Sequence, residues 1–374
     1  MANWRPTWHG QVGHSAAALG VSIGAATVAL ALSFAIIALT GGPPGAAGRA
    51  LYDGAFGSRS QIAGTLAKMI PLTLVAMGWI LAFSVRRINI GFEGQILLGG
   101  VLATFVGLKI GTPPAPLHLA LAVIAGVAAG AAYAGIAAWL WARRSVNEII
   151  STLLLNLVAI QLVSWLVRGP LQEPTRTFPR SSDLPPGARW PRLLQHTSLS
   201  WDLLVAAAMV LVIWFVLKRT AFGFRLRLTG ANEEAARHAG IRTIRVTVIA
   251  FVASGALAGL AGSSLILAGE SGNMSDNFSA GYGFAGIVVA LLARNSPIGA
   301  VPSALLFAAL RQGGGLMEAR VGISSAVVLI TQGLVILLVA GAGYLFERLS
   351  AVRVDAEQEK RAPAAPRTLA GVAE

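Results

Sequence analysis

Carboxylate, amide and glycine residues gather where one long apolar segment begins, in the stretch Asn89-Ile90-Gly91-Phe92-Glu93-Gly94-Gln95. Glycines allow a backbone to unwind, and unwound backbone at membrane depth survives only where protein buries it or water reaches it. A carboxylate inside a membrane costs about 2.5–3.5 kcal/mol, so it usually has a function or a partner. Two roles stay open for Glu93: it lines a path for a polar cargo, or it pairs with Arg86 or Arg87 near the membrane surface.

A second glycine-rich stretch, Gly281-Tyr282-Gly283-Phe284-Ala285-Gly286, repeats part of the first. The shared pattern is Gly-Phe-x-Gly, at 91–94 and again at 283–286. The first copy opens a segment expected to enter the membrane from the cytoplasmic side, and the second copy one that enters from outside. Such a recurrence is typical of inverted-repeat transporters, whose site lies near the interface of the repeats. The sequence therefore predicts an inverted repeat.

A polar stretch between two later apolar segments predicts a short helix of about two turns. Asn232 suits the N-cap, and Glu233 and Glu234 suit the positive end of a helix dipole. Gly240 offers a stop at the C-terminal end. A helix this short is marginal in water, so we expect it to pack on its own bundle or on a partner; a solvated connector is the alternative.

The residues needed for thiol chemistry, for metal binding and for ATP binding are missing from the sequence. The chain has no cysteine, and its five histidines have no spacing that would hold a metal. None of its four lysines follows a glycine, so it has no phosphate loop of the Walker A kind. The net charge of +13 comes from short basic clusters at the ends of apolar segments, which argues against nucleic-acid binding. We expect a protein that is not an enzyme.

The elements that position these residues are apolar helices. Of 374 residues, 55% are apolar and 12% charged, roughly half the charge of a soluble domain, and the mean hydropathy is +0.69. About 20 apolar residues cross a membrane as a helix. The apolar segments are Ala16–Leu39, Gln61–Val85, Ile90–Ile110, Leu117–Trp141, Ile149–Val167, Trp201–Leu217, Val246–Ala268, Tyr282–Ala293, Ile298–Leu310 and Gly322–Phe346. Tyr282–Ala293 and Ile298–Leu310 are short and form either two tilted crossings or one re-entrant hairpin.

The fold class is therefore an all-α integral membrane protein with eight to ten transmembrane helices. Basic pairs end the second, fourth and sixth segments, at 86–87, 143–144 and 218–219, which places those ends and both termini in the cytoplasm. The expected organisation is a cytoplasmic N-terminus (1–15), a transmembrane domain (16–346) with a periplasmic loop (168–200) and a cytoplasmic loop (220–245), and a disordered cytoplasmic tail (347–374).

Four patterns between about 60 and 345 carry a resemblance. The matched positions are the stretch from Asn89 to Gln95; Asn147, Glu148, Ile150, Thr152, Leu154 and Asn156; Gly230, Asn232, Ala235, Ala236, Gly240 and Ile241; and the run from Gly281 to Leu292 with Asn295-Ser296-Pro297 and Gln332-Gly333. Together they resemble the permease family of ATP-binding-cassette (ABC) importers for nucleosides, simple sugars and branched-chain amino acids, and most of all its nucleoside branch. Ala285 departs from the pattern, because relatives often carry an acidic residue there.

The resemblance implies a multi-pass protein of the bacterial inner membrane without a cofactor of its own. Its partners would be two cytoplasmic ATPase subunits, which bind ATP, a second permease (a paralogue or a second copy), a substrate-binding lipoprotein and the lipid bilayer. The implied coupling helix comprises Gly230, Asn232, Glu233, Glu234, Ala235, Ala236, Gly240 and Ile241. Candidates for the translocation path are Asn89, Glu93, Gln95 and Asn156, and for its gating backbone Gly91, Gly94, Gly283, Phe284 and Gly286.

Amides and hydroxyls offer weak polar contacts, which suit a path that must release its cargo. A nucleoside fits such walls, and a simple sugar of the ribose type fits nearly as well. A different class remains as an alternative, an ion-coupled secondary carrier with Glu93 or Glu270 as its ion site.

Overall fold

The structure is a computed structural model that describes residues 24, 27–28, 31–39, 42–111, 113–269, 272–324, 326–334, 337–338 and 341. The chain divides into two compact units, Ile36–Leu329 and a smaller one made of the two ends of the chain. The predicted tails 1–15 and 347–374 and the carboxylate of Glu270 lie outside the described residues.

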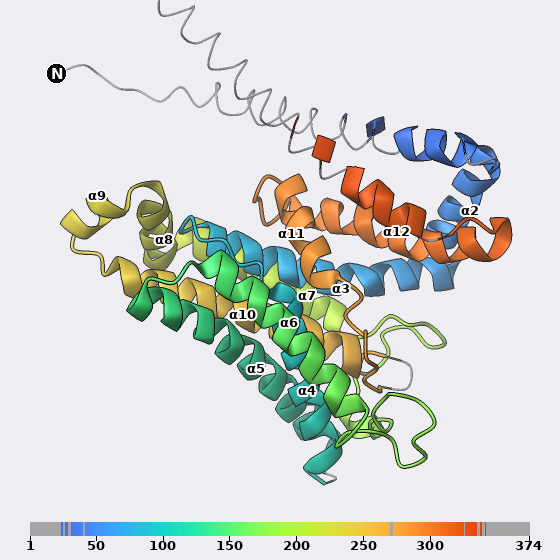
Figure 1. Cartoon of the computed structure of the whole chain (residues 1–374), viewed down its shortest axis with the longest axis horizontal. Coiled ribbons are helices and arrows are strands. Elements are labelled where there is room, and N and C mark those ends of the chain that lie inside the picture. Colours follow the sequence, from blue (N-terminus) through green and yellow to red (C-terminus); the bar gives the residue numbers. More distant parts are fainter. Residues whose placement is uncertain are drawn as a thin grey trace, which may run out of the picture. The chain divides into compact units, whose positions relative to one another are not determined.

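Helices are the regular elements of this unit (Figure 1). They are α2 (Pro44–Phe56), α3 (Arg59–Phe83), α4 (Phe92–Lys109), α5 (Ala115–Arg144), α6 (Glu148–Val167), the 3-10 turn η1 (Pro186–Ala188), α7 (Asp202–Arg219), α8 (Ala221–Ala231), α9 (Glu233–His238), α10 (Thr243–Leu267), α11 (Tyr282–Leu292) and α12 (Ala300–Val321). Each predicted segment from Gln61–Val85 to Tyr282–Ala293 corresponds to one helix, with boundaries that differ by a few residues.

Five of the described helices are long and apolar enough to cross a membrane: α3, α4, α5, α6 and α10. The bent pair α7 and α8, with an angle of 72° between its parts, makes a sixth if it counts as one span. Two further predicted spans, Ala16–Leu39 and Gly322–Phe346, lie partly outside the described residues. The chain is thus an all-helical integral membrane protein.

Glycines bring α4, α5 and α10 into contact at the centre of the bundle. A Cβ atom on Gly99 of α4 would lie 2.6 Å from the carbonyl oxygen of Gly259 in α10, and one on Gly130 of α5 would lie 2.6 Å from the Cα of the same Gly259. Small residues allow helix backbones to approach this closely in lipid, where packing replaces the hydrophobic effect as the attraction between helices.

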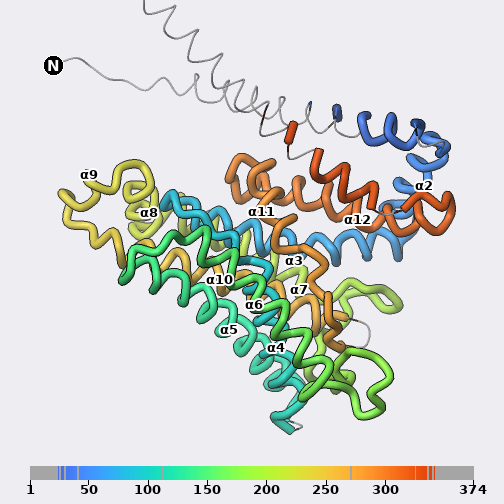
Figure 2. The backbone as a smooth tube through the Cα atoms, viewed as in Figure 1, coloured from blue at the N-terminus to red at the C-terminus, as the bar shows by residue number. Residues whose placement is uncertain are grey.

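A second layer, made of α2, α11 and α12, packs along α3 (Figure 2). Helix α2 is not among the predicted segments; Pro44 occupies its first turn, where a missing N–H costs nothing. Helix α12 continues beyond the predicted end at Leu310 to Val321. The polar residues after Leu310 end the apolar run without ending the helix, so the prediction was too short.

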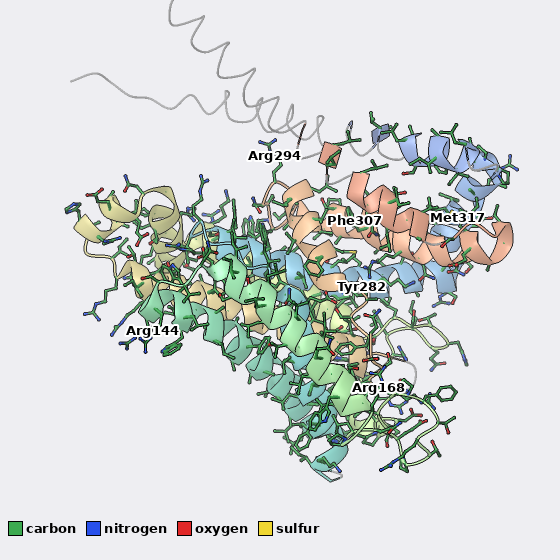
Figure 3. All side chains as sticks on the ribbon, viewed as in Figure 1. Arg144, Arg168, Tyr282, Arg294, Phe307 and Met317 are labelled. Carbon is green, nitrogen blue, oxygen red and sulfur yellow. The ribbon has the colours of Figure 1, made fainter. Side chains whose placement is uncertain are left out.

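The two ends of the bundle are marked by two arginines and differ in what covers them (Figure 3). Arg144 closes α5 at one end, where α8 and α9 also lie, and Arg168 closes α6 at the other. At the Arg168 end, the loop 168–200 packs on α4, α5 and α10 through the buried side chains of Leu184 and Ala188. The predicted periplasmic loop is therefore a packed cover rather than a free connector.

Candidate functional site

Helix α6 holds the segment that precedes α4. The side-chain oxygen of Asn156 accepts the amide of Gly94 at 2.8 Å, and its amide group donates to the carbonyl of Ile90 at 2.9 Å. One turn earlier, the hydroxyl of Thr152 accepts the amide of Ile90 at 3.3 Å. Thr152 and Asn156 are four residues apart, so they lie on one face of α6. Ile150 and Leu154 lie between and beside them in the sequence, and their side chains are exposed on another face.

Asn89 and Gln95 complete the polar network around the same segment. The oxygen of Asn89 accepts the amide of Gly91 at 2.9 Å and the side-chain amide of Gln95 at 3.0 Å. Its own amide group donates to Gln95 at 3.1 Å and to the hydroxyl of Ser254 in α10 at 3.0 Å. Both side chains are at most 1% exposed. Three of the four predicted path residues therefore satisfy each other and the backbone.

The fourth, Glu93, joins α4 to the start of α11. Its carboxylate accepts the amide of Gly281 at 3.1 Å and the amide of Gly283 at 2.8 Å, and the residue is 6% exposed. The first amides of a helix lack partners within the helix, and the helix dipole favours a negative charge beside them. Glu93 thus caps a second helix; the ion pair with Arg86 or Arg87 is absent among the described contacts.

The two Gly-Phe-x-Gly copies meet at this junction. A Cβ on Gly283 would lie 2.7 Å from the Cα of Glu93 and would overlap its amide nitrogen, so only glycine allows the contact. A Cβ on Gly286 would overlap Val75 of α3 in the same way. The copies differ in one respect: Phe92 is fully buried, whereas Phe284 is 44% exposed. The inverted repeat itself stays a prediction.

The coupling motif forms α9, the predicted two-turn helix. The side chain of Asn232 accepts the amide of Ala235 at 2.9 Å, as expected of an N-cap. Gly240 has φ of +77° at the other end, and the amide of Ile241 donates to the carbonyl of Ala236 at 3.0 Å, the pattern of a glycine C-cap. Ala236 is fully buried within the chain, while Glu234 and Ala235 are exposed with Arg237 and His238.

Arg87 connects α9 to the start of α4. Its guanidinium lies 3.5 Å from Glu148 at the start of α6, 3.6 Å from Glu233 of α9 and 4.2 Å from the ring centre of Trp141 in α5. Gly230 adds direct packing, because a Cβ there would overlap the carbonyl oxygen of Ser84 at the end of α3. The exposed helix and the Asn89–Gln95 segment are therefore joined through a few residues.

At the other end of the bundle lies a cavity of about 890 Å³. Its wall consists of the first part of α3 (60–71), the start of α7 at Asp202, the end of α10 (264–269), Tyr282 of α11, Gln312 of α12 and the loop residues 192 and 196–198. Tyr282 lies where α11 begins beside α3 (Figure 3), and the guanidinium of Arg311 lies 4.2 Å above its ring centre. The cavity thus reaches the start of the helix that Glu93 caps.

Sequence reasoning missed this cavity. Its charged residues, Lys68, Arg192 and Asp202, belong to two helices and a loop that lie far apart in the chain. A signal was present, because Lys68 interrupts an otherwise apolar segment, and a charged residue there is costly without a function or a partner. Among the described residues, no group of three or more His, Asp and Glu side chains could hold a metal.

Comparisons with known proteins agree on one family. The family model described as "Branched-chain amino acid transport system / permease component" matches residues 61–340. The glucose ABC transporter permease protein TsgB13 of Haloferax volcanii is 39% identical over 313 residues, covering 81% of this chain and 82% of that protein. The guanosine ABC transporter permease protein NupP of Bacillus subtilis is 34% identical (82% and 89% covered), and the nucleoside ABC transporter permease protein NupB of Lactococcus lactis is 30% identical (78% and 82%). With its multiple apolar helices and a match across most of its length, this multi-pass inner-membrane chain belongs to the branched-chain amino acid transport system permease family, within the ABC permeases of sugar and nucleoside importers.

Proposed function

We propose that the chain forms half of the translocation path of an ABC importer and that partner subunits supply the energy. The observation that carries the proposal is α9: a capped helix with an exposed face. Arg87, just before the segment that starts α4, pairs with Glu233 of α9, and Gly230 of the preceding helix α8 packs on the end of α3. A six-residue helix is not stable alone, and its own chain covers only Ala236. The exposed face with Glu234 and Ala235 then serves as the surface on which an ATPase subunit docks.

In this mechanism the junction of α4 and α11 is the element that moves. Asn89, Gln95 and Asn156 fix the start of α4, and Glu93 ties it to α11, so a displacement of α9 reaches both helices. The path residues then act by holding the backbone at Gly91, Gly94, Gly283 and Gly286 rather than by covalent chemistry. The exposed side chain of Phe284 offers an apolar contact on α11 to lipid or to the second permease subunit.

The proposed cargo is a nucleoside, with a simple sugar as the second candidate. Two of the relatives are named for guanosine and nucleosides and one for glucose, and the amide-rich junction carries a single carboxylate. A substrate-binding lipoprotein would deliver the cargo, and two ATPase subunits would drive the cycle.

The test is uptake of labelled guanosine and glucose by proteoliposomes that hold the chain together with the ATPase, second permease and binding protein proposed as its partners. We expect uptake to require ATP and to continue when ionophores collapse the ion gradients. Uptake that follows a proton or sodium gradient and ignores ATP would instead establish the secondary carrier.

A matched pair of variants tests the docking surface. Ala235→Glu adds a charge to the exposed face of α9 and should abolish ATP-driven uptake and recovery of the ATPase with the permease. Ala221→Glu makes the same change at the exposed first turn of α8, where a carboxylate is tolerated by the helix dipole, and should leave both intact. Equal behaviour of the two variants would refute the docking role of α9.

A further inference from the structure

The cavity between α3, α7 and α10 contains a carboxylate that is not fully satisfied. Asp202 is 3% exposed, and one of its oxygens accepts the hydroxyl of Ser264. Its Oδ1 atom makes no hydrogen bond of good geometry within the described part of the chain, although the hydroxyl of Ser200 and the amides of Asp202 and Leu203 lie close to the carboxylate. A buried carboxylate with poorly aligned donors is costly, so a well-placed donor that enters the cavity would stabilise it.

Two cations and two amides line the same cavity, and the guanidinium of one of them, Arg192, donates to the backbone carbonyls of Ser198, Ala268 and Gly269. Lys68 of α3 faces it, and among the described residues no carboxylate lies at ion-pairing distance from its ammonium group. Gln312 of α12 donates to the side-chain oxygen of Gln61 in α3 at 2.6 Å, which fixes both amides and leaves other N–H groups of the pair for a ligand. Donors and an acceptor therefore converge on one space.

The cavity has the size and the polarity of a small-molecule site. Its volume of about 890 Å³ falls in the range of roughly 300–1,000 Å³ usual for such sites. The apolar part of the wall includes Ala67, Pro71, Leu265, Ala268 and the ring of Tyr282. A hydroxyl group can donate to a carboxylate and accept from an ammonium or an amide, which an aliphatic side chain cannot do.

We propose that this cavity binds the hydroxylated ring of the cargo, the pentose of a nucleoside or a hexose, with Asp202 accepting from ring hydroxyls and Lys68 donating to them. The site precedes the α4–α11 junction on the path, since Tyr282 belongs both to the cavity wall and to the first turn of α11. This assignment rests on the proposed function, because it concerns the same cargo, and it adds a defined holding site to a path otherwise made of backbone and amides.

Saturation-transfer NMR on the full chain in nanodiscs tests the proposal, since it detects weak binding to a membrane protein. The probes are guanosine, D-glucose and L-valine. We expect saturation of the ribose and glucose ring protons, with a weaker effect on the purine proton of guanosine and none on valine. Saturation concentrated on the purine, equal binding of valine, or no transfer to guanosine and glucose from the folded chain would each overturn the proposal.

Two cavity variants and two matched controls locate the site. Asp202→Asn keeps the shape but removes the charge, and Lys68→Met keeps the apolar stem; each should weaken binding about tenfold or more, as loss of a charged hydrogen bond implies. Asp53→Asn and Lys109→Met change a half-exposed and an exposed residue outside the cavity and should bind as the parent does. If Asp202→Asn does not fold, Lys68→Met decides alone, and parent-like binding by it refutes the site.

The outcome separates this proposal from the proposed function. ATP-driven uptake by the parent complex without saturation transfer overturns the cavity assignment and leaves the importer role in place. Ring-selective saturation combined with uptake that ignores ATP supports the cavity and refutes the importer role.

Discussion

The carboxylate of Glu93 in α4 accepts a 2.8 Å hydrogen bond from the amide of Gly283 in α11, a residue 190 positions later in the chain. The contact places an acidic side chain at the start of two helices at once, where both dipoles favour it. Glu93 therefore has a structural role, whereas the sequence left open whether it lines a path for the cargo or pairs with Arg86 or Arg87.

Replacing Glu93 with Gln should reduce the stability of the protein and leave the pH dependence of transport unchanged. Gln offers one acceptor oxygen where the carboxylate offers two, so one of the α11 amides loses its partner, at a cost of about 1.5–3 kcal/mol. Thermal unfolding in nanodiscs measures the loss, and Glu318→Gln, an exposed residue of α12, is the control. A stable variant whose uptake loses its coupling to an ion gradient would indicate the secondary carrier instead.

Asn156→Leu should destabilise the start of α4 strongly. The substitution leaves the amide of Gly94 and the carbonyl of Ile90 without partners in a buried site, at about 1–3 kcal/mol for each group. Leu157→Ala, on the exposed face of the same helix, should change the unfolding temperature little. The prediction is wrong if the two variants unfold at the same temperature.

Arg87→Gln should uncouple ATP hydrolysis from uptake more than it destabilises the protein. Its ion pairs are partly exposed, with side-chain exposures of 25% for Arg87 and 36% for Glu233, and such pairs contribute about 0–1 kcal/mol. The link between α9 and the start of α4 is nevertheless lost. The assay compares transported guanosine with ATP hydrolysed, and Arg86→Gln, an exposed neighbour, is the control; an unchanged ratio for Arg87→Gln contradicts the link.

The loop 168–200 should loosen in acid. The side chain of Arg180 donates to Glu173 at 2.8 Å and lowers the pKa of that carboxyl group, with help from the amide of Phe178. Because the folded pKa is depressed, the contact stabilises the loop above the unfolded pKa, about 4.3, and the stabilisation disappears as the pH falls through the folded value.

Hydrogen exchange of the loop at a series of pH values measures this effect. Glu173→Gln should exchange faster than the parent near neutral pH and show a weaker acid transition. An identical transition in the variant would assign the effect to another carboxylate.

Local signals in the sequence predicted the helices and the caps of α9. Asn232 and Gly240 act on neighbouring backbone groups, so their effect depends on adjacent residues, and the structure confirms both. The sequence did not predict α2, because its residues form no long apolar run. Nor did it predict the cavity, because Lys68 and Asp202 come together only through the packing of α3 against α7.

The role of Glu93 shows the same limit at finer scale. The glycine-rich stretch around Glu93 predicted an interruption of the helical backbone, and residues 87–90 before α4 are indeed not helical. The partners of Glu93, however, belong to α11, and no local pattern predicts a hydrogen bond to amides so far along the chain. The two Gly-Phe-x-Gly copies did not by themselves predict that α4 and α11 touch. The structure shows the reason for the second copy, because Gly283 lies where the two helices are in contact.

The spacing of Glu148, Thr152 and Asn156 along α6 has a consequence for the evolution of the gene. Each inserted or deleted residue turns the rest of a helix by about 100°, so an insertion between Thr152 and Asn156 would move Asn156 away from Gly94. Substitutions at exposed positions such as Leu153 leave the contacts in place. This stretch should therefore tolerate many exchanges of residue but almost no change of length.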